Sequence, residues 1–563
     1  CDSQPTAGSS ANEAGTEMSR VPGAPSLLLL LLVLLLGEDC VSGKLFHIEP
    51  RHPLEGKPPP PGSPWPAPQL WYSSPKQRLV NPDIAFISSA ASVCDVLAKA
   101  FDRYRTLIFY KPCGPYPYDS SSERLTILYI EVLKPYDERY PKQGDAENYT
   151  LEIPDVGPAV LEAETVWGAL RGLETFSQLV HIDAEGNAFV VNVTAVVDYP
   201  TYSYRGILLD SARHFLPVKI LKQNLDAMSY NKFNVFHWHI VDDQSWPLAM
   251  VTYPNLTQSA YTPRHIYSLE EVQDVIEYAR LRGIRVIPEI DSPGHTGALG
   301  KAFPNILTHC YKNGKRDTPD YPEHAARENL DPTNPQTYRV MTNIFREIRN
   351  VFKDEYIHLG MDEVYYACWK SSPEIRRFME AHNFTSISQV EEYYVTRTLS
   401  NVKRLGSKYI IWQDPIENDV QVDRDTLVQV WKGDWKQMAR RLARKGHKMV
   451  LSTFWYLDYI SYAADWKKYY KADPRDFSGT ESEKQLVVGG EACLWSEYVD
   501  ATNLIARLWP RASAVAERLW SSPSVNDVEE AKYRLDEHRC RMRRRGIAAQ
   551  PILNGFCGDE DLD

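Results

Sequence analysis

Two adjacent carboxylates follow a short apolar segment in the middle of the chain. Residues 356–360, Tyr-Ile-His-Leu-Gly, lead through Met361 to Asp362 and Glu363. A short apolar run is typical of a buried strand, and a protein core does not tolerate unpaired carboxylates. Catalytic groups of α/β proteins commonly lie at the carboxyl ends of buried parallel strands. For this pair alone, a solvated turn after an ordinary strand would be a sufficient explanation.

Seven other strand-like segments end in polar or aromatic side chains. Each of these ends alone could be structural, but eight of them together favour a common pocket. The residues after these segments are Asp210, Arg213 and His214; Asp242 and Asp243; Asp291 and His295; Trp412 and Gln413; Trp431; Trp455, Tyr456 and Asp458; and Trp495, Ser496 and Glu497.

These residue types together suit the cleavage of a glycosidic bond. Tryptophan rings can wall the apolar faces of a sugar, and arginine and carboxylate groups can bind its hydroxyl groups. A carboxylic acid can protonate the leaving oxygen. The sequence contains no nucleophile elbow, P-loop or dinucleotide fingerprint, and we expect neither a cofactor nor a metal site.

The segments that carry these residues alternate with amphipathic helices. One such helix is expected over residues 269–282, where Val272, Val275, Ile276 and Ala279 share a face. Eight strand–helix units predict an α/β fold, a (β/α)8 TIM barrel over residues 202–563, in which the strand ends meet at one pocket. The expected strands are 205–210, 233–241, 284–290, 356–360, 408–412, 427–431, 449–454 and 486–490.

The chain before the barrel divides into three parts. Residues 70–201 predict a smaller α+β accessory domain, with a strand at 125–133 and a helix at 165–179. Residues 44–69 are rich in proline and are expected to form an extended lead-in that does not pack. Residues 1–43 contain Met18, Arg20 and the apolar run 27–36, which together predict upstream residues and a secretory signal peptide, removed near Gly43.

Bulk composition excludes some partners. The 563 residues carry a net charge of −11, which does not favour nucleic acid or an anionic membrane. No other apolar stretch is long enough to span a membrane. A secretory route predicts oxidised cysteines and glycans, with sequons at Asn148, Asn192, Asn255 and Asn383. Without Cys1 and Cys40 the cysteine count is odd, and Cys493 is expected to be a buried free thiol.

Several of these motifs resemble those of the family 20 glycoside hydrolases. The resemblance is closest to the lysosomal members of this family in animals. The similarity extends from about Trp65 to Cys557, including Val166-Trp-Gly-Ala-Leu-Arg-Gly in the small domain. The resemblance implies a β-N-acetylhexosaminidase that removes terminal N-acetylhexosamine. The barrel motifs are His-Leu-Gly-x-Asp-Glu-Val, Trp238-His-Ile-Val-Asp-Asp-Gln, Asp291-Ser-Pro-Gly-His, Trp455-Tyr-Leu-Asp and Gly490-Glu-Ala-Cys-Leu-Trp-Ser-Glu.

The resemblance also implies roles for individual residues. Glu363 would be the general acid and base, Asp362 would orient the 2-acetamido group, and Tyr456 would donate a hydrogen bond to its oxygen. His295, supported by Asp291, would belong to the network behind the acid. Arg213, Asp458 and Glu497 would hold hydroxyl groups with Asp242 close behind, and Trp412, Trp431 and Trp495 would line the acetamido and ring pocket.

The family resemblance extends to covalent links and partners. It implies the disulfides Cys310–Cys368 and Cys540–Cys557, while Cys94 either pairs with Cys113 or stays free. It further implies a lysosomal location, a homo- or heterodimer with a related subunit, and a possible lipid-presenting activator protein.

Two positions depart from relatives. The family usually has Gly at the position of Met361. The related subunit that accepts 6-sulfated sugars has Asn-Arg where this chain has Asp458 and Tyr459, which predicts a preference for neutral substrates.

The order of the acid pair predicts a mechanism. Because Asp362 and Glu363 are neighbours in sequence, both approach a sugar from the same side. Retaining enzymes that use a carboxylate nucleophile instead place one carboxyl group on each side of the scissile glycosidic bond. The substrate's own acetamido oxygen is then the better nucleophile. The alternatives are a non-catalytic sugar-binding relative and an enzyme directed at chitooligosaccharides.

Overall fold

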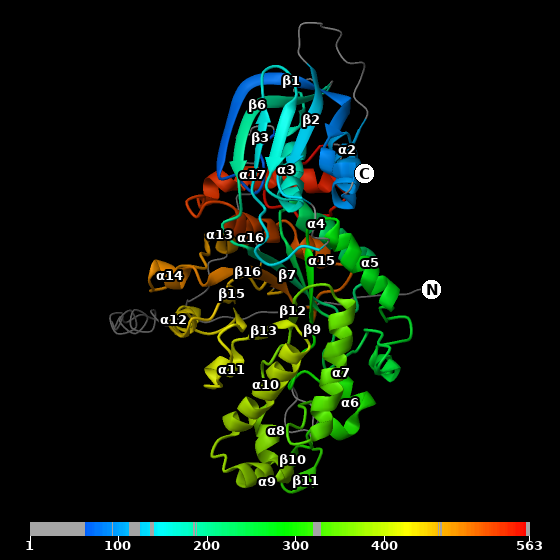
Figure 1. The fold of residues 1–563 in the computed structure, drawn as a ribbon, viewed down its shortest axis with the longest axis vertical. Helices are drawn as coiled ribbons and strands as arrows, with labels where there is room; N and C mark the ends of the chain where they lie inside the picture. The colour runs from blue at the N-terminus through cyan, green and yellow to red at the C-terminus, as the bar shows by residue number, and fades with distance from the viewer. Residues whose placement is uncertain are drawn as a thin grey trace, which may run out of the picture. The chain divides into compact units, whose positions relative to one another are not determined.

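Eight parallel strands close into a barrel, and helices surround it (Figure 1). This computed structural model describes residues 62–558, apart from 93, 112–123, 136–139, 184–185, 187, 319–327, 460 and 462–463. The expected α/β barrel preceded by a smaller domain is confirmed, and each predicted strand segment overlaps a barrel strand. These are β7 (Tyr204–Asp210), β8 (Val235–His239), β9 (Arg285–Glu289), β12 (Tyr356–His358), β13 (Lys408–Trp412), β14 (Leu427–Val430), β15 (Met449–Leu451) and β16 (Val487–Leu494).

The helices between the strands are amphipathic and turn their apolar faces to the barrel. In α5 (Leu269–Arg280), Val272, Val275, Ile276 and Ala279 are buried, and Ser268 forms a capping box with Glu271. The other helices are α4 (Val218–Tyr230), α6 (Gly297–Ala302), α7 (Pro335–Val351), α8 (Tyr366–Ser371), α9 (Pro373–His382), α10 (Ile387–Arg404), α11 (Asp414–Glu417), α12 (Trp435–Lys445), α13 (Trp466–Lys471), α14 (Glu481–Lys484), α15 (Leu504–Leu508), α16 (Arg511–Trp520) and α17 (Val528–Arg544).

The interior of the barrel changes from apolar to charged along the strands. Alternate residues of a strand face the same side, so β8 directs Val235, His237 and His239 inward. Toward the strand starts, Val235 packs in an apolar layer that also contains Tyr204 and Ile410. A charged layer follows, and Gly206 leaves space for it, because a Cβ atom there would lie 2.6 Å from Oε2 of Glu491.

The smaller domain is a six-stranded sheet with two helices. Its strand order is β1-β2-β4-β3-β6-β5. The helices α2 (Asp95–Ile108) and α3 (Val166–Leu179) share one buried core with the sheet. The strands are β1 (Leu70–Ile87), β2 (Arg124–Val132), β3 (Tyr149–Ile153), β4 (Ala159–Ala163), β5 (His181–Ile182) and β6 (Phe189–Asp198).

Buried polar contacts join the two domains. Lys232 lies 2.8 Å from Asp198 with both side chains fully buried, and Arg205 pairs with Glu147 at 2.7 Å. Arg171 donates to the backbone oxygen of Gly283 at 2.8 Å. The described residues all belong to one compact unit, so the change of architecture near residue 201 does not coincide with a gap in packing.

The proline-rich lead-in is packed where it is described, which corrects our expectation for residues 44–69. Trp65 is fully buried, donates from its indole nitrogen to the backbone oxygen of Ser513 at 3.0 Å and faces the ring of Tyr470 at 6.2 Å. The apolar area of one tryptophan is enough to anchor the segment. The predicted signal peptide and the rest of the lead-in lie outside the described residues.

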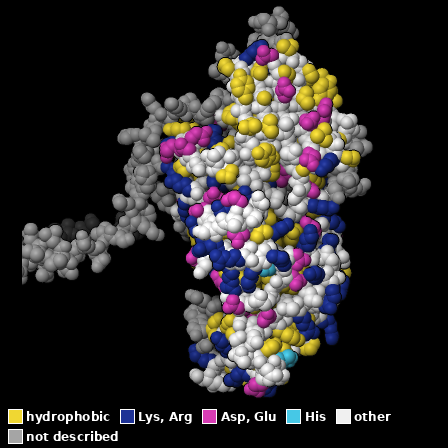
Figure 2. All heavy atoms as spheres, turned by 60° about the vertical axis from the view of Figure 1, so that its left-hand side comes forward, with side chains coloured by type: hydrophobic (Ala, Val, Ile, Leu, Met, Phe, Trp, Pro, Cys, Tyr) yellow, Lys and Arg dark blue, Asp and Glu magenta, His cyan; other side chains and the backbone are white. Residues whose placement is uncertain are grey.

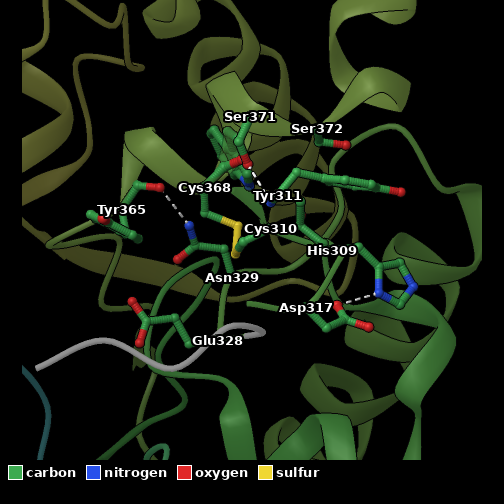
Figure 3. Close-up of a disulfide and its surroundings, with 12 residues drawn as sticks. His309, Cys310, Tyr311, Asp317, Glu328, Asn329, Tyr365, Cys368, Ser371 and Ser372 are labelled. Carbon is green, nitrogen blue, oxygen red and sulfur yellow. Dashed lines mark hydrogen bonds and ion pairs between the residues drawn. A yellow bond between two sulfur atoms is a disulfide. The ribbon is translucent and has the colours of Figure 1, made fainter. Parts of the chain in front are cut away.

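Two disulfides fix the chain as expected. Cys310 is bonded to Cys368 at the start of α8, next to the short hairpin of β10 (Tyr311–Lys312) and β11 (Lys315–Arg316) (Figure 3). Cys540 in α17 is bonded to Cys557. Bonds of this kind form in oxidising compartments.

The remaining described cysteines carry free thiols. Cys493 is buried and free, as expected. Cys94 is also free, so its pairing with Cys113 is wrong and the alternative holds; Cys113 itself lies outside the described residues. Cys94 is 1% exposed and belongs to the core of the small domain, where its thiol packs as an apolar group.

The surface carries charges of both signs. On the face shown in Figure 2, Lys and Arg side chains are interspersed with Asp and Glu. Within the part of the chain that the structure describes, no helix combines the length and the apolar character that a membrane span requires.

Candidate active site

One cavity at the carboxyl ends of the barrel strands collects all twelve predicted catalytic and binding residues. Its volume is about 500 Å³, which suits a small-molecule ligand. His239, Tyr459, Tyr498 and Val499 also line it. The predicted residues in its wall are Arg213, Asp242, Asp291, His295, Asp362, Glu363, Trp412, Trp431, Tyr456, Asp458, Trp495 and Glu497.

The turn that carries the acid pair is strained. Gly360, Met361 and Glu363 have φ angles of 64°, 72° and 50°, in the left-handed region that side chains disfavour. Gly360 is required here, because a Cβ atom would lie 1.7 Å from Oδ1 of Asp291. Met361 accepts the same backbone region and places its side chain in the core. Strain of this kind is typical of functional sites.

His295 links the acid pair to the cavity floor. Its Nδ1 lies 3.3 Å from Oδ1 of Asp242, and its Nε2 lies 3.8 Å from Asp362 and 3.6 Å from Glu363. Although burial opposes protonation, the surrounding carboxylates raise the pKa of His295 well above its usual value. The partner of His295 is therefore Asp242, whereas the resemblance implied Asp291.

Asp291 is instead the partner of the acid turn. Its Oδ1 accepts a hydrogen bond from the backbone nitrogen of Met361 at 2.9 Å. Burial and the neighbouring Asp362 raise the pKa of Asp291 well above its usual value. Burial also raises the pKa of Asp362, to about 7. The hydrogen bond between the two carboxyl groups acts in opposite directions, because it raises the pKa of Asp291 and lowers that of Asp362.

Glu363 lies in a more positive environment. A hydrogen bond from His295 is the main cause that lowers its pKa, and the charges of Lys432 and Arg213 add to this effect. Asp414 holds this side of the turn: its carboxylate accepts from the backbone nitrogen of Glu363 at 3.3 Å and lies 2.5 Å from Nζ of Lys432. The two members of the acid pair thus have pKa values displaced in opposite directions.

Carboxylates surround Arg213 on the opposite side of the cavity. Its guanidinium lies 3.0 Å from Asp210, 2.9 Å from Asp242 and 4.0 Å from Glu497. Burial raises the pKa of Asp458 to about 6, and its Oδ1 has no hydrogen-bond partner among the residues that the structure describes. A buried oxygen without a partner, facing a cavity, is suited to a ligand hydroxyl group.

Aromatic rings form the walls between these polar groups. Trp431 and Tyr456 stack with their centroids 6.0 Å apart, and Tyr459 continues the stack at 5.7 Å from Tyr456. Burial raises the pKa of Tyr456 well above its usual value, so its hydroxyl group remains a hydrogen-bond donor. Trp412 lies 6.0 Å from Trp495.

Three groups of described side chains have atoms close enough together to hold a metal ion. They are His237, Glu289 and His358; Asp242, Asp243 and His295; and Asp291, His295 and Asp362. In each group the histidine nitrogens face carboxylate oxygens. Protonated histidines paired with carboxylates have the same arrangement without a metal ion.

Several residues around the pocket escaped the reasoning from sequence. Lys432 directly follows Trp431, and Asp414 directly follows Gln413. Both would have been found if the search for polar residues after each predicted strand had extended one residue further. Glu289 is the last residue of β9 and points into the barrel below the pocket. His239 ends β8 in the same way.

The chain is similar to known proteins over nearly its whole length. Residues 202–523 match the family described as glycosyl hydrolase family 20, catalytic domain, and residues 64–179 match the one described as beta-acetyl hexosaminidase like. The human beta-hexosaminidase subunit beta is 43% identical over 560 residues, covering 96% of this chain and 99% of that protein. The rat beta-hexosaminidase subunit alpha is 45% identical over 513 residues, covering 88% and 95%.

A solved structure has the same fold. The chitobiase of Flavobacterium johnsoniae superposes with a TM-score of 0.74 at 28% identity, covering 86% of this chain and 73% of that one.

Proposed function

The chain belongs to glycosyl hydrolase family 20 and is a β-hexosaminidase, and from this premise we propose how its pocket works. It binds one terminal β-linked N-acetylhexosamine, of the gluco or galacto type, and hydrolyses its glycosidic bond with retention. Glu363 protonates the leaving oxygen and then activates water. Asp362 orients the acetamido group, whose oxygen attacks the anomeric carbon.

One observation supports this assignment above the others, namely the different placement of two adjacent carboxyl groups in one cavity. Glu363 is half exposed at the cavity mouth, with 52% of its side chain accessible, where a leaving group would depart. Asp362 is buried beside Asp291, deeper in the pocket.

The other residues bind the sugar. Arg213, Asp458 and Glu497 present charged groups to its hydroxyls, and Trp412, Trp431 and Trp495 enclose the acetamido group and the ring. Tyr456 donates to the acetamido oxygen. Aromatic walls exclude water, and fixed donors in a dry pocket strengthen the attraction to the charge that develops during the reaction.

Release of nitrophenol from nitrophenyl N-acetyl-β-glucosaminide at mildly acidic pH tests the assignment. We expect turnover that saturates with substrate and is inhibited by free N-acetylglucosamine. A pocket that only binds the sugar would bind free N-acetylglucosamine in a titration but would release no nitrophenol from the glycoside. That result would contradict the enzyme assignment. Glu497→Gln is a matched variant that should raise KM and preserve most of kcat.

The charge at the pocket rim predicts which substituents are accepted. A sulfate group near Asp458 would meet its carboxylate and that of Glu497, and at about 4 Å like charges repel by roughly 4 kcal/mol near a protein surface. We therefore expect kcat/KM for a 6-sulfated N-acetylglucosaminide to be roughly a thousandfold below that for the neutral sugar. Because the pKa of Asp458 is about 6, the discrimination should grow as the pH rises from 5 to 7.

Variants at the rim separate charge from shape. The double variant Asp458→Asn/Tyr459→Arg should raise the ratio of sulfated to neutral turnover, while Tyr498→Arg places the same charge elsewhere on the rim and serves as the control. Equal rates for both sugars with the unmodified protein would contradict the role of Asp458.

We further infer a cellular setting. The relatives are named as subunits, which supports assembly into a homo- or heterodimer, and a lipid-presenting activator protein fits a glycolipid substrate. Two disulfides and a pocket suited to acid pH support delivery to the lysosome through the secretory pathway. Among the predicted glycan sites, Asn148, Asn255 and Asn383 are exposed and Asn192 is half-buried in β6.

A further inference from the structure

A chain of buried charged side chains runs beneath the pocket, on the side away from the proposed sugar site. Glu289 and Glu491 are fully buried in the barrel, together with His237 and His239. Burial of so many ionisable groups is unfavourable unless each is paired. Packing alone therefore does not explain why these four charged side chains are buried together.

The groups alternate in sign along the chain. His237 lies between Glu491, at 2.8 Å from Nδ1, and Glu289, at 2.9 Å from Nε2. His239 lies between Glu289, at 2.8 Å from Nδ1, and Asp242, at 2.8 Å from Nε2. Because ionised carboxylates cannot donate, a histidine hydrogen-bonded to one on each side must carry protons on both nitrogens. His239 is in this position, whereas His237 is hydrogen-bonded to Glu491 and faces Glu289 as an ion pair. The order is acid, imidazolium, acid, imidazolium, acid.

The upper end of this chain reaches the site in two places. Asp242 is the residue that faces Nδ1 of His295, and His295 in turn faces Glu363. Oε1 of Glu289 accepts the indole N–H of Trp412 at 2.9 Å, and Trp412 is a wall of the cavity. The carboxylate of Glu289 thus supports Asp242 through His239 and also holds the indole ring of Trp412.

We propose that Glu289 and His239 are positioning residues for the reaction: they hold Asp242 ionised below His295 and fix the ring of Trp412 in the pocket wall. The inference rests on the proposed hydrolysis. It gives the buried charges a purpose that packing would not require, since apolar side chains of similar volume would fill the same space at no electrostatic cost.

The charge of Asp242 depends on all the groups that face it. Replacement of Glu289 by glutamine presents an amide to Nδ1 of His239, so the ring can give up one proton and become neutral. Asp242 then loses one of the cations that keep it ionised and takes up a proton at a higher pH than before. The groups that face Asp242 are Arg213 and Asp210 from the end of β7, His239 from β8, and Asp243 and His295 from the loops after β8 and β9.

The test is the pH dependence of kcat/KM in Glu289→Gln. We expect a loss of about tenfold to a hundredfold, the scale of a small misplacement at an active site, with KM nearly unchanged and a larger loss at pH 4 than at pH 6. Glu289→Asp keeps the charge and should restore the shape of the profile, even with a lower kcat. The control is Glu174→Gln, a buried glutamate that binds Arg545 at 2.7 Å between the small domain and α17.

Equal losses at pH 4 and pH 6, in the same proportion as for Glu174→Gln, would overturn the proposal. If Glu289→Gln does not fold, the unmodified protein still decides: with ¹⁵N-labelled histidine, His237 and His239 should stay doubly protonated from pH 5 to 8, because their pKa values are raised to about 9 and about 10 despite burial. Neutral rings at pH 6 would refute the chain. An unmodified protein that releases no sugar would refute the proposed function and leave this measurement intact.

Discussion

A substrate with a hydroxyl group at C2 in place of the acetamido group should be hydrolysed roughly 10⁵-fold more slowly than the acetamido sugar with the same leaving group. The acetamido oxygen is the nucleophile in our mechanism, and a group tethered to the sugar reacts at a high effective concentration. Without it, water must attack directly. Initial rates with two nitrophenyl glycosides measure the ratio.

The geometry of the acid pair underlies this expectation. Asp362 and Glu363 are carried by one tight turn, so both approach the sugar from the same side. Asp362 lies beside Asp291 and 3.8 Å from His295, where its carboxylate can face the acetamido nitrogen. The hydrogen bond between the two carboxyl groups raises the pKa of Asp291 and lowers that of Asp362, and a positive charge forming on that nitrogen favours the ionised form of Asp362.

Two further experiments bear on the same step. A thiazoline that mimics the cyclised acetamido group should inhibit strongly, because it resembles the intermediate of the reaction. Similar rates for the hydroxyl and acetamido substrates would contradict the mechanism, and so would a covalent sugar ester on Asp362 after treatment with a fluorosugar.

Glu363→Gln should lower kcat/KM by about 10²- to 10⁴-fold for a natural glycoside, which is the usual contribution of a general acid. The loss should be smaller for a nitrophenyl glycoside, since that leaving group departs without a proton. Rates with the two classes of substrate give the comparison. Glu355→Gln alters a glutamate at the opposite end of β12, bonded to Lys408 at 2.5 Å, and should leave both rates unchanged.

The pH profile provides a second measure of the same variant. The reaction needs Glu363 protonated and Asp362 ionised, and the pKa of Glu363 lies below its usual value while that of Asp362 is about 7. The unmodified enzyme should therefore show a bell-shaped kcat/KM with its maximum at mildly acidic pH. In Glu363→Gln the alkaline limb should disappear, and residual activity should rise with pH and level off above about 7. An alkaline limb that persists would assign the proton to another group.

The sequence predicted the barrel and its pocket because both follow a local rule. Apolar segments of strand length repeat between amphipathic helices, and polar residues directly after them meet at one end of a parallel barrel. Arg213, Asp242 and Glu497 were found in this way although they are far apart in the chain. The resemblance then supplied roles that spacing alone could not.

Contacts that depend on strand register were beyond the reach of the sequence. Glu289 pairs in register with His239 on one side and with His358 on the other, and only this alignment places three ionisable groups together. The partner of His295 depends on the same alignment. The burial of Trp65 depends on a contact with Ser513, far along the chain, so composition alone indicated a free segment.

The bond between Cys310 and Cys368 has a consequence for the covalent integrity of the molecule. It joins residues 58 positions apart, and the exposed pair Lys315 and Arg316 lies inside the loop it closes. A protease that cuts there would separate β7–β9 from β12–β16 in the chain without separating them in space. The mature enzyme would then be two polypeptides tied by sulfur, seen as one band on a non-reducing gel and as two after reduction.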